Sequence, residues 1–398
     1  MIKKNHSTKQ SNASSLLDVG MTFFRLGLTS FGGPVAHLSF FHDEFVKRKK
    51  WFTEQTYADL VALCQFLPGP ASSQVGIAIG LSRAGVAGSI LAWLGFTLPS
   101  ALFLAASGIG LSLFEGKIPP NILHGLKLVA VPVVAQALWN MGKKLCYEKI
   151  RLSLAILGLA ITNIIPFGFA QTIAMICGAV IGRIYLKDIN TLPHTPLKIR
   201  VSKQAAALIL ILFISALFLL PILAKTLDNQ TLKLFDSFFR SGSLVFGGGH
   251  VVLPLLKSEV VNPGWVNEGS FMAGYGLAQA IPGPLFSFTA YLGAVMLQAP
   301  TSWLGAILCL FAAFLPSFFL VFGTLPFWEQ IRKNQNMRAS LQGVNAIVVG
   351  LLLAAFFDPV WSSAIFTTKD FTIAAIGFLL LESWHVPSWI VVILSALL

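Results

Sequence analysis

Long apolar segments alternate with short polar ones along almost the whole chain. The segments 84–113, 121–142 and 205–224 are each long enough to cross a bilayer, because a membrane-spanning helix needs about 20 predominantly apolar residues. Shorter apolar segments follow at 152–167 and 168–186. The pattern therefore predicts an all-α polytopic membrane protein.

The two halves of the chain repeat one another. The segment FFRLGLTSFGG at 23–33 returns as FFRSGSLVFGG at 238–248, with seven of the eleven positions identical. Downstream, QFLPGP at 65–70 corresponds to QAIPGP at 279–284. Self-similarity at a nearly constant spacing indicates internal duplication, so we expect two homologous repeats. A further matched motif is Leu-Pro-Ser, at 98–100 and 315–317.

A single apolar segment joins the two repeats, after a polar linker that contains Pro193 and Pro196. If each repeat crosses the bilayer an even number of times, one connecting transmembrane helix inserts the second repeat upside down. The result is a pair of inverted-topology repeats. The expected organisation is a polar cytoplasmic N-terminus at 1–15, a first repeat at 16–187, a linker with the connecting helix at 188–230, and a second, inverted repeat at 231–398.

Composition excludes two classes of soluble protein. The chain holds 55% hydrophobic and 11% charged residues, whereas about a quarter of the residues in a soluble domain are charged. A water-soluble enzyme is therefore excluded. The net charge of +12 would fit a nucleic-acid-binding protein only if a polar domain carried it, and no segment is long and polar enough to form one. We expect the basic residues to mark cytoplasmic loops instead.

Basic clusters predict the topology. With a cytoplasmic N-terminus, the loops around Lys143 and Lys198 face the cytoplasm, as the positive-inside rule requires. The basic cluster at 47–50 faces the cytoplasm only if the apolar segment before it enters and leaves the bilayer on the same side. Its counterpart in the second half, at 262–264, carries no charge, as expected for the outer face. Full crossings are the alternative, and both versions keep the halves inverted. The expected broken or re-entrant elements are 18–46, 55–82, 234–257 and 268–298.

Each half also carries two interruptions of its apolar helices, a Phe-Gly-Gly and a Pro-Gly-Pro, both of which break helices. Such backbone is tolerated at membrane depth only where it is buried in protein or lines a wet cavity. A helix that resumes after a break presents free N–H groups and its positive dipole end to an anion. The alternative is that the breaks only kink packed helices. The predicted substrate site comprises Gly32, Gly33, Gln65, Pro68, Gly69, Pro70 and Ser72 in the first half, and Gly247, Gly248, Gln279, Pro282, Gly283, Pro284 and Ser287 in the second.

Arg25 and Arg240 occupy the same repeat position, seven residues before the Gly-Gly pair, in otherwise apolar segments. An arginine at a helix centre costs about 2.5 to 3.5 kcal/mol, so it usually faces a cavity or a partner, although it can also snorkel to the headgroups. Two such arginines related by a pseudo-two-fold axis would suit a tetrahedral dianion held by fork-shaped donors. Lys127, with Asn345 as its repeat partner, is a candidate for a secondary anion contact.

Few other residues suggest chemistry. Glu44 and Glu259 are repeat-matched acids, so they are candidates for proton uptake and release, with solvated carboxylates as the alternative. The four cysteines lie apart in apolar segments without metal-ligand spacing, so we expect no metal site and no cofactor. The first apolar segment carries Arg25 and no small-residue cleavage site, and a cleaved signal peptide is not expected.

The motif FFRLGLTSFGGP, the Pro68-Gly69-Pro70 segment and their second-half copies resemble the chromate ion transporter family in its long two-domain form. The resemblance covers nearly the whole chain. It implies a multi-pass transporter of the bacterial inner membrane that exports chromate from the cytoplasm, with oppositely oriented halves and chemiosmotic drive. The second half reads Gly-Gly-Gly-His where the first reads Gly-Gly-Pro-Val, so the two anion contacts need not be equivalent. The resemblance does not separate chromate from sulfate, which has nearly the same shape and charge.

Three other functions stay open from the sequence: a transporter of another oxyanion, a passive anion channel, and an intramembrane enzyme acting on a lipid phosphate. Such an enzyme would need a nucleophile or carboxylate set beside its arginine, and neither half has one around its breaks. No GxxxxGK[ST] motif is present, which excludes ATP drive from this chain. The sequence therefore predicts a non-enzymatic secondary transporter of a small oxyanion in a lipid bilayer, with no nucleic-acid partner and with a homodimer left open.

Overall fold

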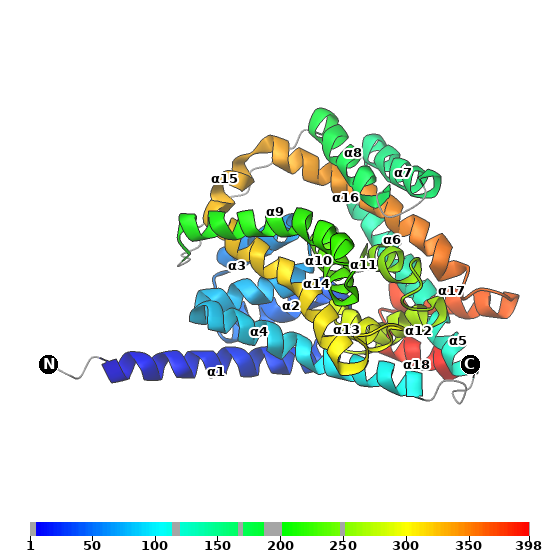
Figure 1. The fold of residues 1–398 in the computed structure, drawn as a ribbon, viewed down its shortest axis with the longest axis horizontal. Coiled ribbons are helices and arrows are strands. Elements are labelled where there is room, and N and C mark those ends of the chain that lie inside the picture. The colour runs from blue at the N-terminus through cyan, green and yellow to red at the C-terminus, as the bar shows by residue number, and fades with distance from the viewer. Residues whose placement is uncertain (1–4, 114–119, 166–169, 187–200, 247–250, 398) are drawn as a thin grey trace.

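The computed structural model describes residues 5–113, 120–165, 170–186, 201–246 and 251–397, and this part of the chain is helical with no strand (Figure 1). The predicted all-α class is thus confirmed. Among the described residues, four helices are long and apolar enough to cross a membrane: Ala71–Leu113, Lys203–Thr226, Ser302–Phe327 and Gln335–Trp361.

The first repeat contains two broken helices followed by a group of shorter ones. The long α4 bends at Ala84 and Gly85, where the backbone is not helical. A turn at Val129 divides the predicted span 121–142 into two helices, which corrects the expectation of one continuous span. The elements are α1 (Asn5–Thr29), α2 (Gly33–His42), the π-helical η1 (Asp43–Arg48), α3 (Glu54–Phe66), α4 (Ala71–Leu113), α5 (Pro120–Leu128), α6 (Ala130–Leu145), α7 (Lys149–Ile164) and α8 (Ala170–Tyr185).

The second repeat follows the connecting helix α9 (Lys203–Thr226) and reproduces this order of elements. A π-helical turn again follows the first broken helix, so even this local irregularity is repeated. The elements are α10 (Gln230–Leu244), α11 (Val252–Leu256), η3 (Lys257–Val261), α12 (Glu268–Ala280), η4 (Leu285–Ser287), α13 (Phe288–Ala294), α14 (Ser302–Thr324), η5 (Leu325–Phe327), α15 (Trp328–Lys333), α16 (Gln335–Ala355), η6 (Phe356–Trp361), α17 (Thr368–Glu382) and α18 (Ser388–Leu397).

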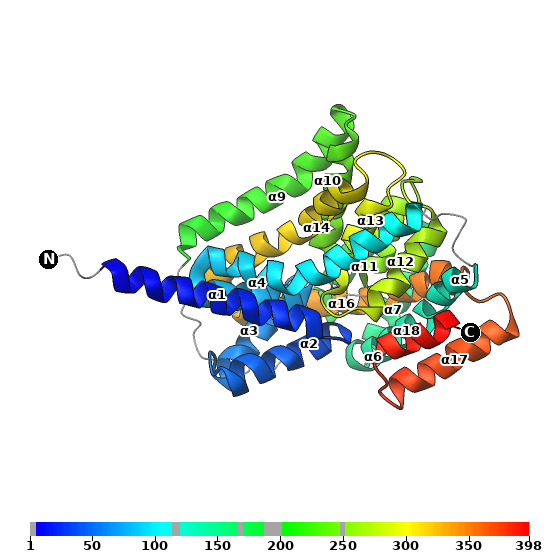
Figure 2. The same ribbon diagram turned by 90° about the horizontal axis from the view of Figure 1, so that it is seen from below.

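Both broken elements of the first repeat run to a break and return to their starting side. Lys49, after η1, forms an ion pair with Asp18 of α1. Arg83, at the end of the straight first part of α4, lies 4.6 Å from the ring centroid of Trp51, and its carbonyl accepts a hydrogen bond from Ser15. The end of η1 and the bend of α4 therefore lie beside the middle of α1, and the first part of α1 projects beyond them (Figure 2).

The second repeat doubles back in the same way. Trp265 and Leu297 stand at the repeat positions of Trp51 and Arg83, and the backbone N–H of Leu297 donates to the carbonyl of Trp265 over 2.9 Å. The hydroxyl of Tyr291 on α13 donates to the carbonyl of Ser270 on α12, also over 2.9 Å. These bonds hold the beginning of α12 beside the end of α13.

Buried aromatic rings hold the first broken element closed. Phe23 of α1, Phe41 of α2 and Phe45 of η1 are fully buried, and their ring centroids lie between 5.1 and 5.9 Å apart. Each ring removes a large apolar surface from its surroundings and adds a favourable ring-ring geometry. The fold of α2 back onto α1 therefore has its own packed core.

Small residues allow close helix crossings at equivalent places in the two repeats. A Cβ atom added to Gly27 of α1 would lie 2.6 Å from the carbonyl oxygen of Gly95 on α4. At the repeat position of Gly27, Gly242 of α10 lies directly against the carbonyl of Ala313 on α14. Close backbone approach through small residues is typical of membrane helix packing.

The repeats interlock instead of lying side by side. Helix α16 of the second repeat packs on α7 and α8 of the first, and α18 packs on α5 (Figure 1). A Cβ atom added to Gly182 of α8 would lie 2.5 Å from the carbonyl oxygen of Ala339 on α16. Motion of one repeat relative to the other must therefore pass through these tight contacts.

Candidate functional site

The breaks of the two repeats meet in reciprocal pairs. The N–H of Gly69 donates to the carbonyl of Val245 over 2.6 Å, and the N–H of Gly283 donates to the carbonyl of Ser30 over 3.0 Å. Ser30 and Val245 are repeat equivalents, each directly preceding a Phe-Gly-Gly. Each Pro-Gly-Pro is thus bonded to the residue that directly precedes the Phe-Gly-Gly of the other half, and these bonds lie at the repeat interface.

The glycine of each Pro-Gly-Pro has a backbone conformation that other residues rarely adopt. Gly69 has φ of +116° and Gly283 has φ of +101°. Glycine reaches positive φ without steric cost because it has no Cβ atom. The turn presents the glycine N–H to the opposite repeat, and α4 begins directly after it at Ala71.

The two Leu-Pro-Ser motifs bring a serine to each Pro-Gly-Pro. A Cβ atom added to Gly69 would lie 3.3 Å from the Oγ atom of Ser317, and one added to Gly283 would lie 2.7 Å from the Oγ atom of Ser100. The hydroxyl of Ser100 also lies 2.7 Å from that of Ser287. Ser100 and Ser317 were not among the predicted site residues, although the recurrence of Leu-Pro-Ser in both halves was the signal that could have identified them.

Buried polar groups around the breaks are only partly satisfied. Gln74 donates from Nε2 to the carbonyl of Pro68 over 2.6 Å, and Ser72 lies 3.3 Å from Nδ1 of His37. Burying a polar atom without a hydrogen bond costs free energy, so such atoms commonly mark a water or a ligand. Among the described residues, the buried atoms here without a partner include Oγ of Ser30, Ser73 and Ser317, Oγ1 of Thr97, Oε1 of Gln74 and Nε2 of His37.

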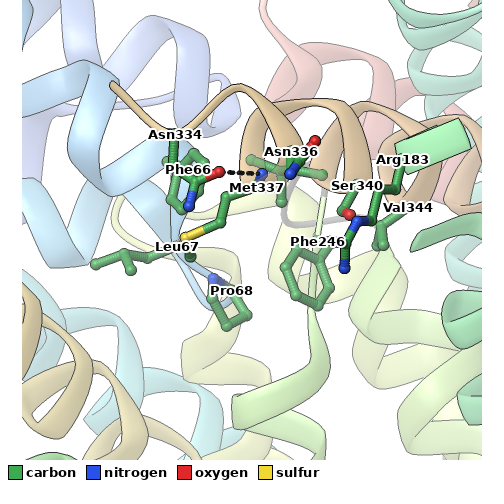
Figure 3. A pocket seen from close by; sticks show the side chains of 11 residues that line it. Phe66, Leu67, Pro68, Arg183, Phe246, Asn334, Asn336, Met337, Ser340 and Val344 are labelled. Atoms are coloured by element: carbon green, nitrogen blue, oxygen red, sulfur yellow. Dashed lines mark hydrogen bonds between the residues drawn. The ribbon is translucent and has the colours of Figure 1, made fainter. Parts of the chain in front are cut away.

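A pocket of about 430 Å³ opens beside one of the break pairs (Figure 3). Pro68 and Phe246 line its inner part, and the first turns of α16 line one wall. Figure 3 shows the guanidinium of Arg183 beside Ser340 of α16, facing into the pocket. Within the described part of the chain no ion pair with Arg183 is found. Polar side chains from Asn334, Asn336 and Ser340 accompany it.

The two repeat-matched arginines lie in different environments. Arg25 is exposed, on the face of α1 that also exposes Leu17, Met21 and Leu28. Arg240 binds Glu259 through both terminal nitrogens, each at 3.0 Å. The structure therefore does not bring the two arginines together, because Arg25 faces outward and carboxylates bind Arg240.

The matched acids also differ in their partners. Glu44 is buried and binds Arg48 of the same π-helical turn, whereas its equivalent Glu259 reaches across to Arg240 on α10. The Arg240 guanidinium also donates from Nε to Asp236 over 3.0 Å. The second repeat thus contains a three-residue charged cluster that the first repeat lacks.

The remaining predicted site residues are dispersed. Gln65 is exposed. Gln279 is half-buried, and its backbone carbonyl accepts a hydrogen bond from the hydroxyl of Ser388. The ammonium of Lys127 lies beside Gly269 at the start of α12, whereas the second Pro-Gly-Pro follows the end of that helix, so Lys127 is not brought to the breaks. Asn345 is half-buried on α16, next to the pocket residue Val344. Gly32 is exposed and Gly33 half-buried at the start of α2, and Gly247 and Gly248 lie outside the described residues.

Comparison with known proteins supports the repeat and indicates a class. The sequence model of the chromate transporter family matches residues 17–183 and again 232–398. A chromate transport protein of Pseudomonas aeruginosa is 27% identical over 392 residues, which cover 94% of this chain and 89% of that one. The chromate transport protein of Cupriavidus metallidurans is 26% identical, over 86% of this chain and 82% of its own length. No solved structure matches the chain.

Proposed function

The chain belongs to the chromate transporter family, and from this premise we propose that it is a secondary transporter that exports chromate and binds it at the paired breaks. The observation that carries the proposal is the reciprocal bonding of Gly69 to Val245 and of Gly283 to Ser30. Inverted-repeat transporters bind substrate where discontinuous helices of the two halves meet. The relatives are named as transport proteins, in agreement with a non-enzymatic role.

The chemistry around the first Pro-Gly-Pro suits a tetrahedral dianion. Helix α4 begins at Ala71 and presents unpaired N–H groups and the positive end of a long helix dipole. Ser73 and Ser317 add buried hydroxyls that have no partner among the described residues. Chromate carries four oxygens that accept hydrogen bonds, and so it would satisfy these donors together. Sulfate, with the same shape and charge, is the second candidate substrate.

The pocket that contains Arg183 is the proposed entry for the anion. It extends from the first turns of α16 to Pro68 and Phe246, one residue from each break of a bonded pair. The basic linker that follows α8 predicts that this side is cytoplasmic. A transporter open on this side would load chromate from the cytoplasm, as export requires. The multi-pass arrangement in the bacterial inner membrane, with a cytoplasmic N-terminus, belongs to the same proposal.

Helix α16 separates this entry from a second pocket of about 210 Å³ near its other end. There Lys257 binds Glu268 and Asp358, with each nitrogen-oxygen distance 3.2 Å. These ion pairs tie η3 to the start of α12 and to η6, which continues α16. We propose that this second pocket belongs to the exit path and that the Lys257 ion pairs keep it closed when the cytoplasmic pocket is open.

A transport assay tests the function directly. Everted membrane vesicles that contain the protein should accumulate chromate when energised, because export from the cell corresponds to uptake into such vesicles. Chromate, sulfate and molybdate are compared, with the membrane potential and the pH gradient collapsed separately. Uptake that survives the collapse of both gradients would instead favour a passive channel, and equal uptake of sulfate would broaden the substrate to tetrahedral oxyanions.

Cysteine accessibility tests the proposed topology. In a chain whose four native cysteines are replaced, Lys47→Cys should react with an impermeant reagent only from the cytoplasmic face, because the ion pair of Lys49 with Asp18 holds the end of η1 beside α1, before its break. The side chain of Lys47 is 65% exposed, so access does not limit labelling. Pro263→Cys, at the equivalent loop of the second repeat, is the matched control and should react only from outside. Labelling of both positions from one face would contradict inverted repeats.

A further inference from the structure

A buried charged cluster bridges the two limbs of the broken helix in the second repeat. Arg240 and Asp236 lie on α10, before the break, and Glu259 lies on η3, after it. The guanidinium binds both oxygens of Glu259 at 3.0 Å and one oxygen of Asp236 at 3.0 Å. One cation is therefore shared by two carboxylates.

The charges in this cluster do not balance. The side chain of Asp236 is 6% exposed, that of Glu259 is 16% exposed and that of Arg240 is 30% exposed. With both acids ionised, the cluster carries a net charge of −1 in a poorly solvated position. The second oxygen of Asp236, Oδ1, is buried and has no hydrogen-bond partner in the described part of the chain. An unpaired buried carboxylate is costly, and a proton removes that cost.

Neighbouring elements do not supply the missing positive charge. Helix α14 packs most closely on α10 and contains no acidic or basic residue, with only Cys309 as a titratable group. The cations of α9, Lys203 and Lys225, lie at its two ends, and α11 has no charged residue. Lys257 of η3 binds Glu268 and Asp358 instead, and Lys233 of α10 binds Asp228.

The first repeat has no equivalent cluster. The position of Asp236 is occupied there by Met21, which is exposed, and Arg25 and Glu44 do not form an ion pair with each other. The two limbs of the first broken element are joined instead by the simple ion pair of Asp18 with Lys49, which has no excess acid. The acid-rich cluster is thus specific to the second broken element.

The cluster also connects directly to the proposed anion site. Helix α10 continues from Arg240 to Leu244, and the next residue, Val245, accepts the bond from Gly69 with its carbonyl, while Phe246 lines the entry pocket. A change in charge at Asp236 alters how strongly α10 is held to η3, and therefore the position of the segment that leads into the break. Conformational coupling of this kind needs a contact that differs between two states.

We infer that Asp236 is the binding site of a proton whose movement is coupled to anion transport. The inference rests on the proposed transport function. A proton from the outer side adds to Oδ1 of Asp236 and brings the charge of the cluster from −1 to zero. It leaves to the cytoplasm when the anion departs in the opposite direction. Glu259 stays ionised in this scheme because it accepts both terminal donors of Arg240.

Uptake of chromate into everted vesicles, measured with and without a pH gradient, tests the inference. In the unmodified protein, collapsing the pH gradient should lower uptake, whereas in Asp236→Asn the remaining uptake should be insensitive to that gradient. Asp236→Glu keeps a titratable group and should retain the dependence. Asp228→Asn is the matched control, since it removes an exposed carboxylate from the start of the same helix region and should behave like the unmodified protein.

Several results would overturn the inference. Asp236→Asn with undiminished dependence on the pH gradient is one of them, and an unmodified protein whose uptake ignores the gradient is another. Either result leaves chromate transport itself intact, whereas absence of uptake in the unmodified protein contradicts the proposed function instead. If Asp236→Asn does not accumulate in the membrane, Asp236→Glu decides: it should shift the pH of half-maximal uptake, and an unchanged pH profile contradicts the inference.

Discussion

Chromate uptake by everted vesicles should fall by about tenfold or more when Gly69 is replaced by alanine, because a residue forced into an unfavourable backbone region costs about 1 to 3 kcal/mol. Gly69 has φ of +116°. The new Cβ atom would lie 2.5 Å from Nε2 of Gln74, which donates to the carbonyl of Pro68. The substitution therefore strains the turn and displaces the side chain that supports it.

The equivalent change in the other half tests the pairing of the breaks. Gly283→Ala should have a similar effect, because its Cβ atom would lie 2.7 Å from Oγ of Ser100 and the residue has φ of +101°. Gly110→Ala in α4 is the matched control, since nothing lies within 4 Å of its added Cβ atom. Near-normal uptake by Gly69→Ala at equal protein abundance would show that the Pro-Gly-Pro turn is only a kink.

The repeat and the positions of the breaks were predictable from the sequence because both are local patterns. Pro68-Gly69-Pro70 and its copy at 282–284 interrupt apolar helices whatever surrounds them. The pairing of Gly69 with Val245 was not predictable, because it joins residues far apart in the chain. It depends on how the two halves interlock, and periodicity contains no information about that.

The arginines show where a repeat argument fails. Arg25 and Arg240 share a motif, yet the chain around them differs at Met21 and Asp236, and these neighbours set the outcome. Asp236 lies one helical turn before Arg240 and binds it, whereas Met21 offers no charge to Arg25. Identical residues in homologous halves therefore acquire different roles when the residue four positions earlier changes from apolar to acidic.

No repeated sequence motif identified Arg183, the arginine of the entry pocket. Arg183 lies near the end of α8, without a repeat-matched motif, where a basic residue is usually an interfacial anchor. Only the packing of α16 on α8 brings it beside Ser340 and opposite Phe246. The function of such a residue follows from tertiary contacts, and the sequence alone therefore assigned no role to Arg183.

Replacing Arg183 with glutamine should raise the chromate concentration for half-maximal uptake by about tenfold, with a smaller change in the maximal rate. A hydrogen bond to a charged group is worth about 1.5 to 3 kcal/mol, and each 1.4 kcal/mol corresponds to a factor of ten in affinity. The lower end applies because Arg183 is exposed and water screens its charge.

Two further variants separate the effect of the positive charge of Arg183 from the effect of the planar shape of its guanidinium. Arg183→Lys keeps the charge without the planar fork, so it should fall between the glutamine variant and the unmodified protein. Lys144→Gln removes one exposed positive charge from another basic loop and is the matched control. If Arg183 attracts the anion through its charge, the effect of Arg183→Gln on half-maximal uptake should be smaller at high ionic strength. At 1 M salt, exposed charges more than about 3 Å apart are largely screened from one another. Equal effects of Arg183→Gln and Lys144→Gln would mean that only the general surface charge matters, and that the pocket beside Pro68 and Phe246 is not the entry.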